Sequence, residues 1–165
     1  MNFLEQLLAE WFEYRGYFVR RNVRVGPRSK GGYECELDIV AFHPERKHLV
    51  HVEPSTDADS YEIRDRRYEK KFAAGRKYVP GLFTGLKIPA EIEQYSVFHT
   101  GTRKNGREEI GGRPFKLLKE VVVEILADLK SKPMQSSAVP ENLALLRLLQ
   151  VVAKHRGSVI DVLQG

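Results

Sequence analysis

Two acidic side chains lie within apolar segments, where burying a carboxylate is costly unless a partner meets its charge. Asp38 lies in "ELDIVAF", residues 36–42, and Glu53 lies near the end of "LVHVEPS", residues 49–55. Two carboxylates that are held close together repel each other unless a proton or a cation lies between them. Mg²⁺ prefers oxygen ligands of this kind, and it can activate water and stabilise charge on a phosphate.

A β-hairpin would bring these two acids together. Residues 33–42 and 48–53 have the composition of strands, and the polar turn 43–47 is short enough to make them antiparallel neighbours. Because side chains alternate along a strand, Asp38 and Glu53 can then lie near each other at one end of the sheet. The sequence therefore predicts a paired-carboxylate site that suits a divalent ion.

Simpler roles remain open for these acids and their neighbours. Asp38 could form an ion pair with an arginine of the preceding strand, residues 17–25. Glu36 shares the face of Asp38, and a salt bridge is the favoured role for it. His51 shares the face of Glu53, and we expect a hydrogen-bonded polar residue there rather than a metal ligand.

The remaining elements predict an α/β fold with a mixed central sheet of about four strands flanked by helices. Asn2 is the expected N-cap of the first helix, with Glu5 as its capping-box partner. Segments 26–32, 78–89 and 101–114 are predicted loops. In chain order, the predicted elements are helix 3–14, strand 17–25, strand 33–42, strand 48–53, helix 59–75, strand 95–100 and helix 115–130.

The C-terminal part has a different composition. Residues 131–142 are typical of a linker, so we predict a domain over 1–130 and a helical extension over 143–165. The extension is apolar on several sides and such a surface needs cover. We expect it to pack across a homodimer partner or to begin a longer helical domain; the alternative is that it folds back onto its own sheet.

Three segments resemble the PD-(D/E)xK nuclease superfamily, with archaeal Holliday-junction resolvases and Mrr-like restriction enzymes most similar. They are "NFLEQLLAEWFEYRGYFV" with Glu5, "ELDIVAF" with Asp38 and "LVHVEPS" with Glu53, and the resemblance covers roughly residues 1–130. It implies a restriction-endonuclease-like fold and hydrolysis of DNA phosphodiester bonds. It also implies that Asp38, Glu53 and Glu5 hold Mg²⁺ or Mn²⁺.

The sequence departs from the family pattern at Ser55, where the family has a lysine that supports the attacking water and the phosphate. The family tolerates migration of this lysine to another element. On helix 59–75, Lys71 lies roughly 80° from the apolar stripe, on the same flank as Arg64, whereas Lys70 points away from the stripe. Lys71 can reach along the sheet by snorkelling, so we predict that it replaces the missing lysine as a catalytic residue.

Net charge and loop composition favour a polyanionic partner. The chain carries a formal net charge of +5 and has a pI of about 9.3, and a basic surface attracts nucleic acid. The basic loops could equally be solvated surface without a ligand. The residues predicted to contact DNA are Arg28, Lys30, Ser55, Arg64, Arg103 and Lys104.

Composition excludes several other classes. No apolar run is long enough to span a bilayer, and the N-terminal segment lacks the basic start of a signal peptide. One cysteine, Cys35, excludes a disulfide framework and a cysteine zinc site. We therefore expect a cytoplasmic protein. For its function, we expect a nuclease, and the alternative is a catalytically inactive nuclease-fold module that binds nucleic acid or a protein. A third alternative is an interaction protein in which the acids only pair with arginines.

Overall fold

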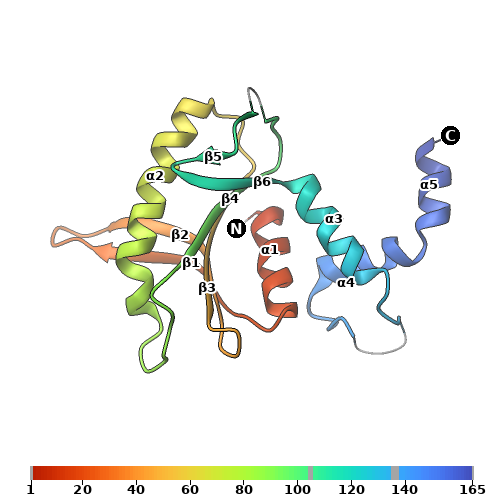
Figure 1. The fold of residues 1–165 in the computed structure, drawn as a ribbon, viewed down its shortest axis with the longest axis horizontal. Helices are drawn as coiled ribbons and strands as arrows, with labels where there is room; N and C mark the ends of the chain where they lie inside the picture. Colours follow the sequence, from red (N-terminus) through yellow and green to blue (C-terminus); the bar gives the residue numbers. More distant parts are fainter. Residues whose placement is uncertain (1, 104–105, 135–137, 165) are drawn as a thin grey trace.

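The computed structural model describes residues 2–103, 106–134 and 138–164. Within them, six strands form one mixed sheet in the order β1-β2-β3-β4-β6-β5, with helices packed on both sides (Figure 1). The predicted α/β class is confirmed. The strands are β1 (Phe18–Pro27), β2 (Tyr33–His43), β3 (His48–Ser55), β4 (Glu93–Phe98), β5 (Glu109–Ile110) and β6 (Arg113–Leu117).

The pairing of β2, β3 and β4 follows the prediction. Strands β2 and β3 form an antiparallel hairpin in which Ile39 pairs with Val52, so Asp38 and Glu53 are the next residues along the two strands. Strand β4 lies parallel to β3, with Ser96 beside Glu53. The crossover runs through a helix and a short 3₁₀ turn, as the length of the connection required.

Helices cover the two faces of the sheet unequally. Val50 and Val52 of β3 pack into a core formed with α1, α3 and α4, whereas the alternate side chains of β3 face α2. The N-terminus of α1 is capped by Asn2, which accepts from the backbone N–H of Leu4 and Glu5. The helices are α1 (Phe3–Tyr14), α2 (Tyr61–Tyr78), the 3₁₀ turn η1 (Val79–Leu82), α3 (Leu118–Leu129), α4 (Ala144–Lys154) and α5 (Arg156–Gln164).

The prediction of about four strands was wrong because β5 and β6 lie in segments assigned to a loop, 101–114, and to a helix, 115–130. Strand β6 pairs parallel to β4 and buries Phe115 and Leu117, and α3 begins only at Leu118. Gly111 and Gly112 both have positive φ, which permits the tight turn between β5 and β6. A hairpin this short has too few alternating apolar and polar residues for its sequence pattern to be distinguished from that of a helix.

The C-terminal segment divides into two parts. Helix α4 packs on α1 and α3, and Leu143 and Leu146 belong to their core. Glu10 of α1 is buried and accepts from the backbone N–H of Leu145 (2.9 Å) and Leu146 (3.1 Å), which caps the N-terminus of α4. By contrast, α5 has no buried residue among those described, and it extends away from the sheet (Figure 1). The expected homodimer therefore stays a prediction, and it now concerns α5.

The helices in the described part of the chain are each too short or too polar to cross a bilayer.

Candidate functional site

Asp38, Glu53 and Lys71 meet at the end of the β2–β3 hairpin that faces α2. The Lys71 ammonium lies 2.9 Å from Asp38 Oδ1 and also donates to Glu53 Oε2. Lys71 reaches this position from α2, the element that follows Glu53 in the chain. The structure thus brings together the two acids and the lysine that the sequence analysis selected.

The Glu53 side chain has no exposed area, and other groups meet its remaining hydrogen-bonding capacity. Its Oε1 accepts from His51 Nε2 at 2.7 Å and from the backbone N–H of Asp38 at 3.3 Å. With Lys71 on Oε2, three donors stabilise one carboxylate that is withdrawn from water. These three hydrogen-bond donors explain how the Glu53 carboxylate can be buried inside the protein.

His51 is held in turn by a glutamine from the neighbouring strand. Gln94 Nε2 lies 2.9 Å from His51 Nδ1 and also donates to the carbonyl of Phe72 at 2.9 Å. If Gln94 donates to Nδ1, then Nε2 carries the ring proton and donates to Glu53. The predicted role of His51 as a satisfied polar residue agrees with this geometry, and Gln94 is a member of the network that the sequence did not reveal.

Gly75 allows α2 to approach this network closely. A methyl group at Gly75 would overlap the His51 ring and the Gln94 amide. The glycine in an otherwise regular helix therefore marks the point of closest approach to the sheet. Sequence inspection could have flagged it, since glycine disfavours a helix interior.

The protonation of the site follows from burial. Burial, together with the nearby Glu53 carboxylate, raises the pKa of Asp38 to about 7, and burial also raises the pKa of Glu53. Burial opposes the charge of Lys71, but attraction to both carboxylates outweighs it and raises the pKa of the ammonium. Burial lowers the pKa of His51 to about 3, so the imidazole is neutral at pH 7.

A second charged cluster lies at the rim of the site, centred on Asp57. Arg64 Nε lies 3.1 Å from Asp57 Oδ1, and both Arg67 and the Ser55 hydroxyl donate to Oδ2. Although burial acts in the opposite direction, hydrogen bonds from Ser55, Arg67 and Arg64 lower the pKa of Asp57 to about 2. Arg64, Arg67 and Lys71 are spaced by three and four residues, so one flank of α2 carries all three cations.

A cavity of about 260 Å³ adjoins both clusters. Asp38 and Lys71 keep 16% and 21% of their side chains exposed, so a solute can reach them although Glu53 is covered. The walls come from the start of α1, the end of β3 and one flank of α2. The lining residues are Asn2, Asp38, Pro54, Ser55, Thr56, Asp57, Arg67, Tyr68 and Lys71.

Two carboxylates of this site, Asp38 and Glu53, are of a type that can bind a metal. Among residues 2–103, 106–134 and 138–164, no group of three or more His, Cys, Asp or Glu side chains is placed to hold a metal ion. Glu5 lies in the first turn of α1, where its Oε1 accepts from Asn2 Nδ2 at 2.7 Å. Because Mg²⁺ is commonly held by one or two carboxylates plus waters and substrate phosphate, Asp38 and Glu53 are compatible with it.

Among the described residues that were predicted to bind nucleic acid, some are not available to a ligand. Arg28 and Lys30 are exposed in the turn between β1 and β2. Arg64 is buried against Asp57 and Phe98, which removes it from the surface. Arg103 pairs with two acids of its own chain.

The other two residues predicted to contact DNA are Ser55 and Lys104. Ser55 is also buried and donates to Asp57 rather than facing solvent. Lys104 lies outside the described residues. Arg67, which the sequence analysis did not select, lines the cavity and is 36% exposed, so it is better placed than Arg64 to meet an anion there.

No family model matches the chain, and a search of curated proteins finds no relative.

Proposed function

We propose that the protein is a metal-dependent nuclease that hydrolyses DNA phosphodiester bonds at the Asp38–Glu53–Lys71 site. The observation that carries the proposal is the position of the Lys71 ammonium between the two carboxylates. A lysine supplied by α2 provides the positive charge that Ser55 cannot provide from β3. Stabilisation of charge that develops in the transition state is commonly the largest single contribution to such catalysis.

The order of elements supports the same proposal. A helix, three antiparallel strands, a crossover helix and a parallel strand are the sequence of α1, β1, β2, β3, α2 and β4. The resemblance to the PD-(D/E)xK superfamily implies such a core with the acids at the end of its hairpin. We therefore propose a restriction-endonuclease-like fold for residues 1–130.

The site has a net negative charge that a divalent ion could neutralise. Two ionised carboxylates and one ammonium sum to a single negative charge, and a raised pKa lets Asp38 take up a proton when no further cation is present. Asp38 and Glu53 would hold Mg²⁺ or Mn²⁺, with Glu5 assisting from α1, and the bound ion would activate water and stabilise phosphate charge. Lys71 then has to release at least one carboxylate, which frees its ammonium for the phosphate.

The surroundings supply further contacts for a polyanion. Arg67 lines the cavity beside Lys71, and Arg28, Lys30 and Arg103 lie in or near the loops that we propose to follow the DNA backbone. Contacts of this kind to phosphate give affinity without sequence preference and weaken as salt is added. Arg64 and Ser55 instead hold the rim in place through Asp57.

One observation favours a second candidate, a catalytically inactive module that binds nucleic acid or a protein. Lys71 already contacts both carboxylates, so part of their charge is met without a metal. If a metal cannot displace the ammonium, the same residues would only hold α2 on the sheet. The two candidates differ in their response to divalent ions.

The deciding experiment is a cleavage assay with Mg²⁺ or Mn²⁺ on linear duplex, single-stranded and four-way-junction DNA, and on RNA. Asp38→Asn and Glu53→Gln should abolish cleavage, and Lys71→Met should lower the rate by about two or more orders of magnitude. Lys70→Met is the matched control, because Lys70 is the exposed neighbour on α2 and should leave the rate unchanged.

Calorimetric titration with Mg²⁺ separates binding from chemistry. Wild-type protein should bind the ion, and Asp38→Asn should not. DNA binding that falls with salt, with no cleavage under any condition and no Mg²⁺ uptake, would establish the inactive module instead.

A further inference from the structure

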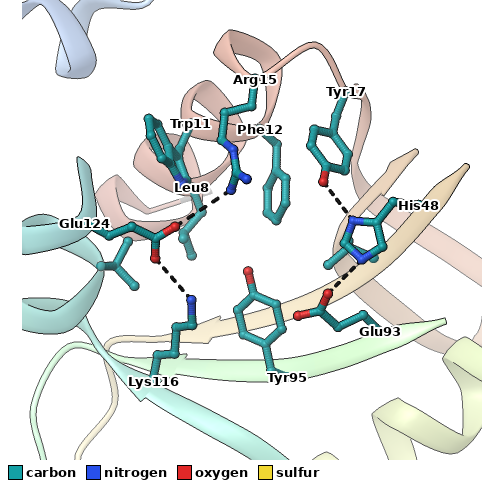
Figure 2. Close-up of a pocket in the computed structure, with 12 residues that line it drawn as sticks. Leu8, Trp11, Phe12, Arg15, Tyr17, His48, Glu93, Tyr95, Lys116 and Glu124 are labelled. Atoms are coloured by element: carbon teal, nitrogen blue, oxygen red, sulfur yellow. Dashed lines mark hydrogen bonds and ion pairs between the residues drawn. The ribbon is translucent and has the colours of Figure 1, made fainter. Parts of the chain in front are cut away.

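A second cavity, of about 200 Å³, lies on the opposite face of the sheet from the Lys71 site. Figure 2 shows it between α1, α3 and strands β3, β4 and β6. Its apolar wall includes Leu8, Trp11, Phe12 and Val121. This volume is below the range of about 300–1,000 Å³ of drug-sized pockets, so the cavity suits a small molecule.

Two polar groups point into this cavity without a hydrogen bond from the described part of the chain. The Tyr95 hydroxyl rises from β4 into the centre of the space, and the Arg15 guanidinium descends from the end of α1 (Figure 2). Arg15 comes no closer than 3.7 Å to Glu124, which is too long for a hydrogen bond. Trp11 is stacked beneath the guanidinium, with 5.3 Å between Arg15 Cζ and the ring centroid.

The other end of the cavity is internally satisfied. Tyr17 Oη lies 2.7 Å from His48 Nδ1, and His48 Nε2 lies 2.7 Å from Glu93 Oε2. Tyr17 and Glu93 therefore occupy both ring nitrogens of His48. The unused donors are therefore confined to the Arg15 and Tyr95 end.

The charges at the Arg15 end leave one positive charge in excess. Arg15 and Lys116 lie beside a single carboxylate, Glu124, and Lys116 makes the closer pair with it, at 3.1 Å. Burial and the nearby carboxylates of Glu93 and Glu124 raise the pKa of Tyr95, so its hydroxyl keeps its proton and can donate at neutral pH. Both unused groups thus offer hydrogens to an acceptor.

We propose that this cavity is a binding site for a small organic carboxylate, whose anionic group meets Arg15 and Tyr95 and whose apolar body packs against Trp11 and Phe12. A planar carboxylate accepts two parallel hydrogen bonds from a guanidinium, which gives the contact its geometry. Glu124 is the internal competitor of such a ligand, because it lies against the same two cations. The site is distinct from the proposed nuclease centre and does not depend on it.

The test uses 3-phenylpropionate as the probe and the fluorescence of Trp11 as the signal, since the chain has one tryptophan. Its alcohol analogue, 3-phenylpropanol, has the same apolar body without the charge, and 2-phenylethylphosphonate has the same body with a phosphorus oxyanion in place of the carboxylate. We expect saturable binding of the carboxylate with a dissociation constant on the order of millimolar, the range for a ligand of this size. The alcohol should bind at least about tenfold more weakly, because it lacks the charge-assisted bonds.

Three substitutions make the assignment specific. Arg15→Met should remove the preference for the carboxylate over the alcohol, and Tyr95→Phe should weaken carboxylate binding by about two- to tenfold, the value of one hydrogen bond. Glu124→Gln should tighten carboxylate binding several-fold because it removes the competing anion, an effect that misfolding cannot produce. Circular dichroism checks that each variant is folded.

Equal affinity for the carboxylate and the alcohol, or no saturable binding of either, would overturn the proposal. So would a Glu124→Gln variant that binds the carboxylate more weakly than wild type. Tighter binding of 2-phenylethylphosphonate than of 3-phenylpropionate, with the same dependence on Arg15, would keep the anion site and overturn the assignment to a carboxylate.

Discussion

Strand β3 presents one histidine on each of its faces, and each histidine pairs with a glutamate at the same distance. His51 Nε2 lies 2.7 Å from Glu53, and His48 Nε2 lies 2.7 Å from Glu93. The first pair has no exposed side-chain area, whereas His48 and Glu93 are 38% and 52% exposed. Identical contacts thus occur in two different dielectric environments.

The polar groups on the two faces of the sheet differ in how far they are buried. On the α2 face, burial raises the pKa of Asp38 from 3.8 to about 7 and lowers the pKa of His51 from 6.5 to about 3. On that face, other side chains and the backbone supply the hydrogen-bond donors for Glu53. On the α1 face, water reaches the polar groups, and Arg15 and Tyr95 keep unused donors. On the α2 face the described polar groups mostly satisfy one another, whereas on the α1 face two donors remain for an external ligand.

Two lysines on opposite faces give the strongest test of this contrast. Lys71→Met should lower the free energy of unfolding by about 3–5 kcal/mol, because it leaves buried carboxylates without their cation. Lys116→Met should cost less than about 1 kcal/mol, since Lys116 and its partner Glu124 are each 43% exposed. Urea denaturation at pH 7 measures both, and equal losses would break the comparison.

The pH dependence of stability sharpens the same contrast. The folded protein keeps a proton on Asp38 up to about pH 7, whereas the unfolded chain releases it near its ordinary pKa of about 3.9. The Asp38 contribution to stability is therefore lost as the pH rises from about 4 to 7, at no more than about 1.4 kcal/mol per pH unit.

The measurement is the difference in unfolding free energy between wild type and Asp38→Asn across that range. Burial of neutral His51 gives the opposite slope below pH 6.5, but burial is the largest cause of this slope and is the same in both proteins, so His51 contributes little to the difference. Wild type should lose stability relative to Asp38→Asn as the pH rises. A difference that does not change with pH would show that Asp38 is ionised throughout.

Substitutions at two glycines compare a closely packed position on α2 with an exposed position on α5. Gly75→Ala should destabilise the fold by about 1–3 kcal/mol, because the methyl group overlaps the ring of His51 and the amide of Gln94. Gly157→Ala meets no atom within 4 Å and should be neutral or stabilise by up to about 1 kcal/mol. Thermal melts of the two variants measure the difference, and a stable Gly75→Ala would contradict the close approach of α2.

The smallest effect on folding is expected in α5. Val162 and Leu163 are 81% and 79% exposed, so Val162→Ser and Leu163→Ser should change the free energy of unfolding by less than about 0.5 kcal/mol. If α5 pairs with a second copy of the chain, the same variants should shift light scattering from dimer to monomer. A wild-type protein that is monomeric in light scattering would refute the homodimer.

Local patterns were sufficient for the parts of the fold that depend on neighbouring residues. The alternation in β2 and β3 with their short turn predicted the hairpin, and Asn2 predicted the start of α1, because these signals act within a few residues. The helical phase of α2 also predicted which lysine faces the sheet. The sequence thus determined the proximity of Asp38 and Glu53 and the identity of Lys71 as their partner.

Tertiary packing decided what depends on residues that are distant in the chain. Strand β6 exists because β4 offers it an edge to pair with, and α4 begins where the buried Glu10 of α1 accepts its N–H groups. Other features likewise arise only when α1, α2 and the sheet meet. They are the burial of Arg64 and Ser55, the exposure of Arg67, and the unused donors of Tyr95 and Arg15. No short sequence pattern encodes burial at such sites, and burial sets both the cost of a charge and the availability of a hydrogen bond.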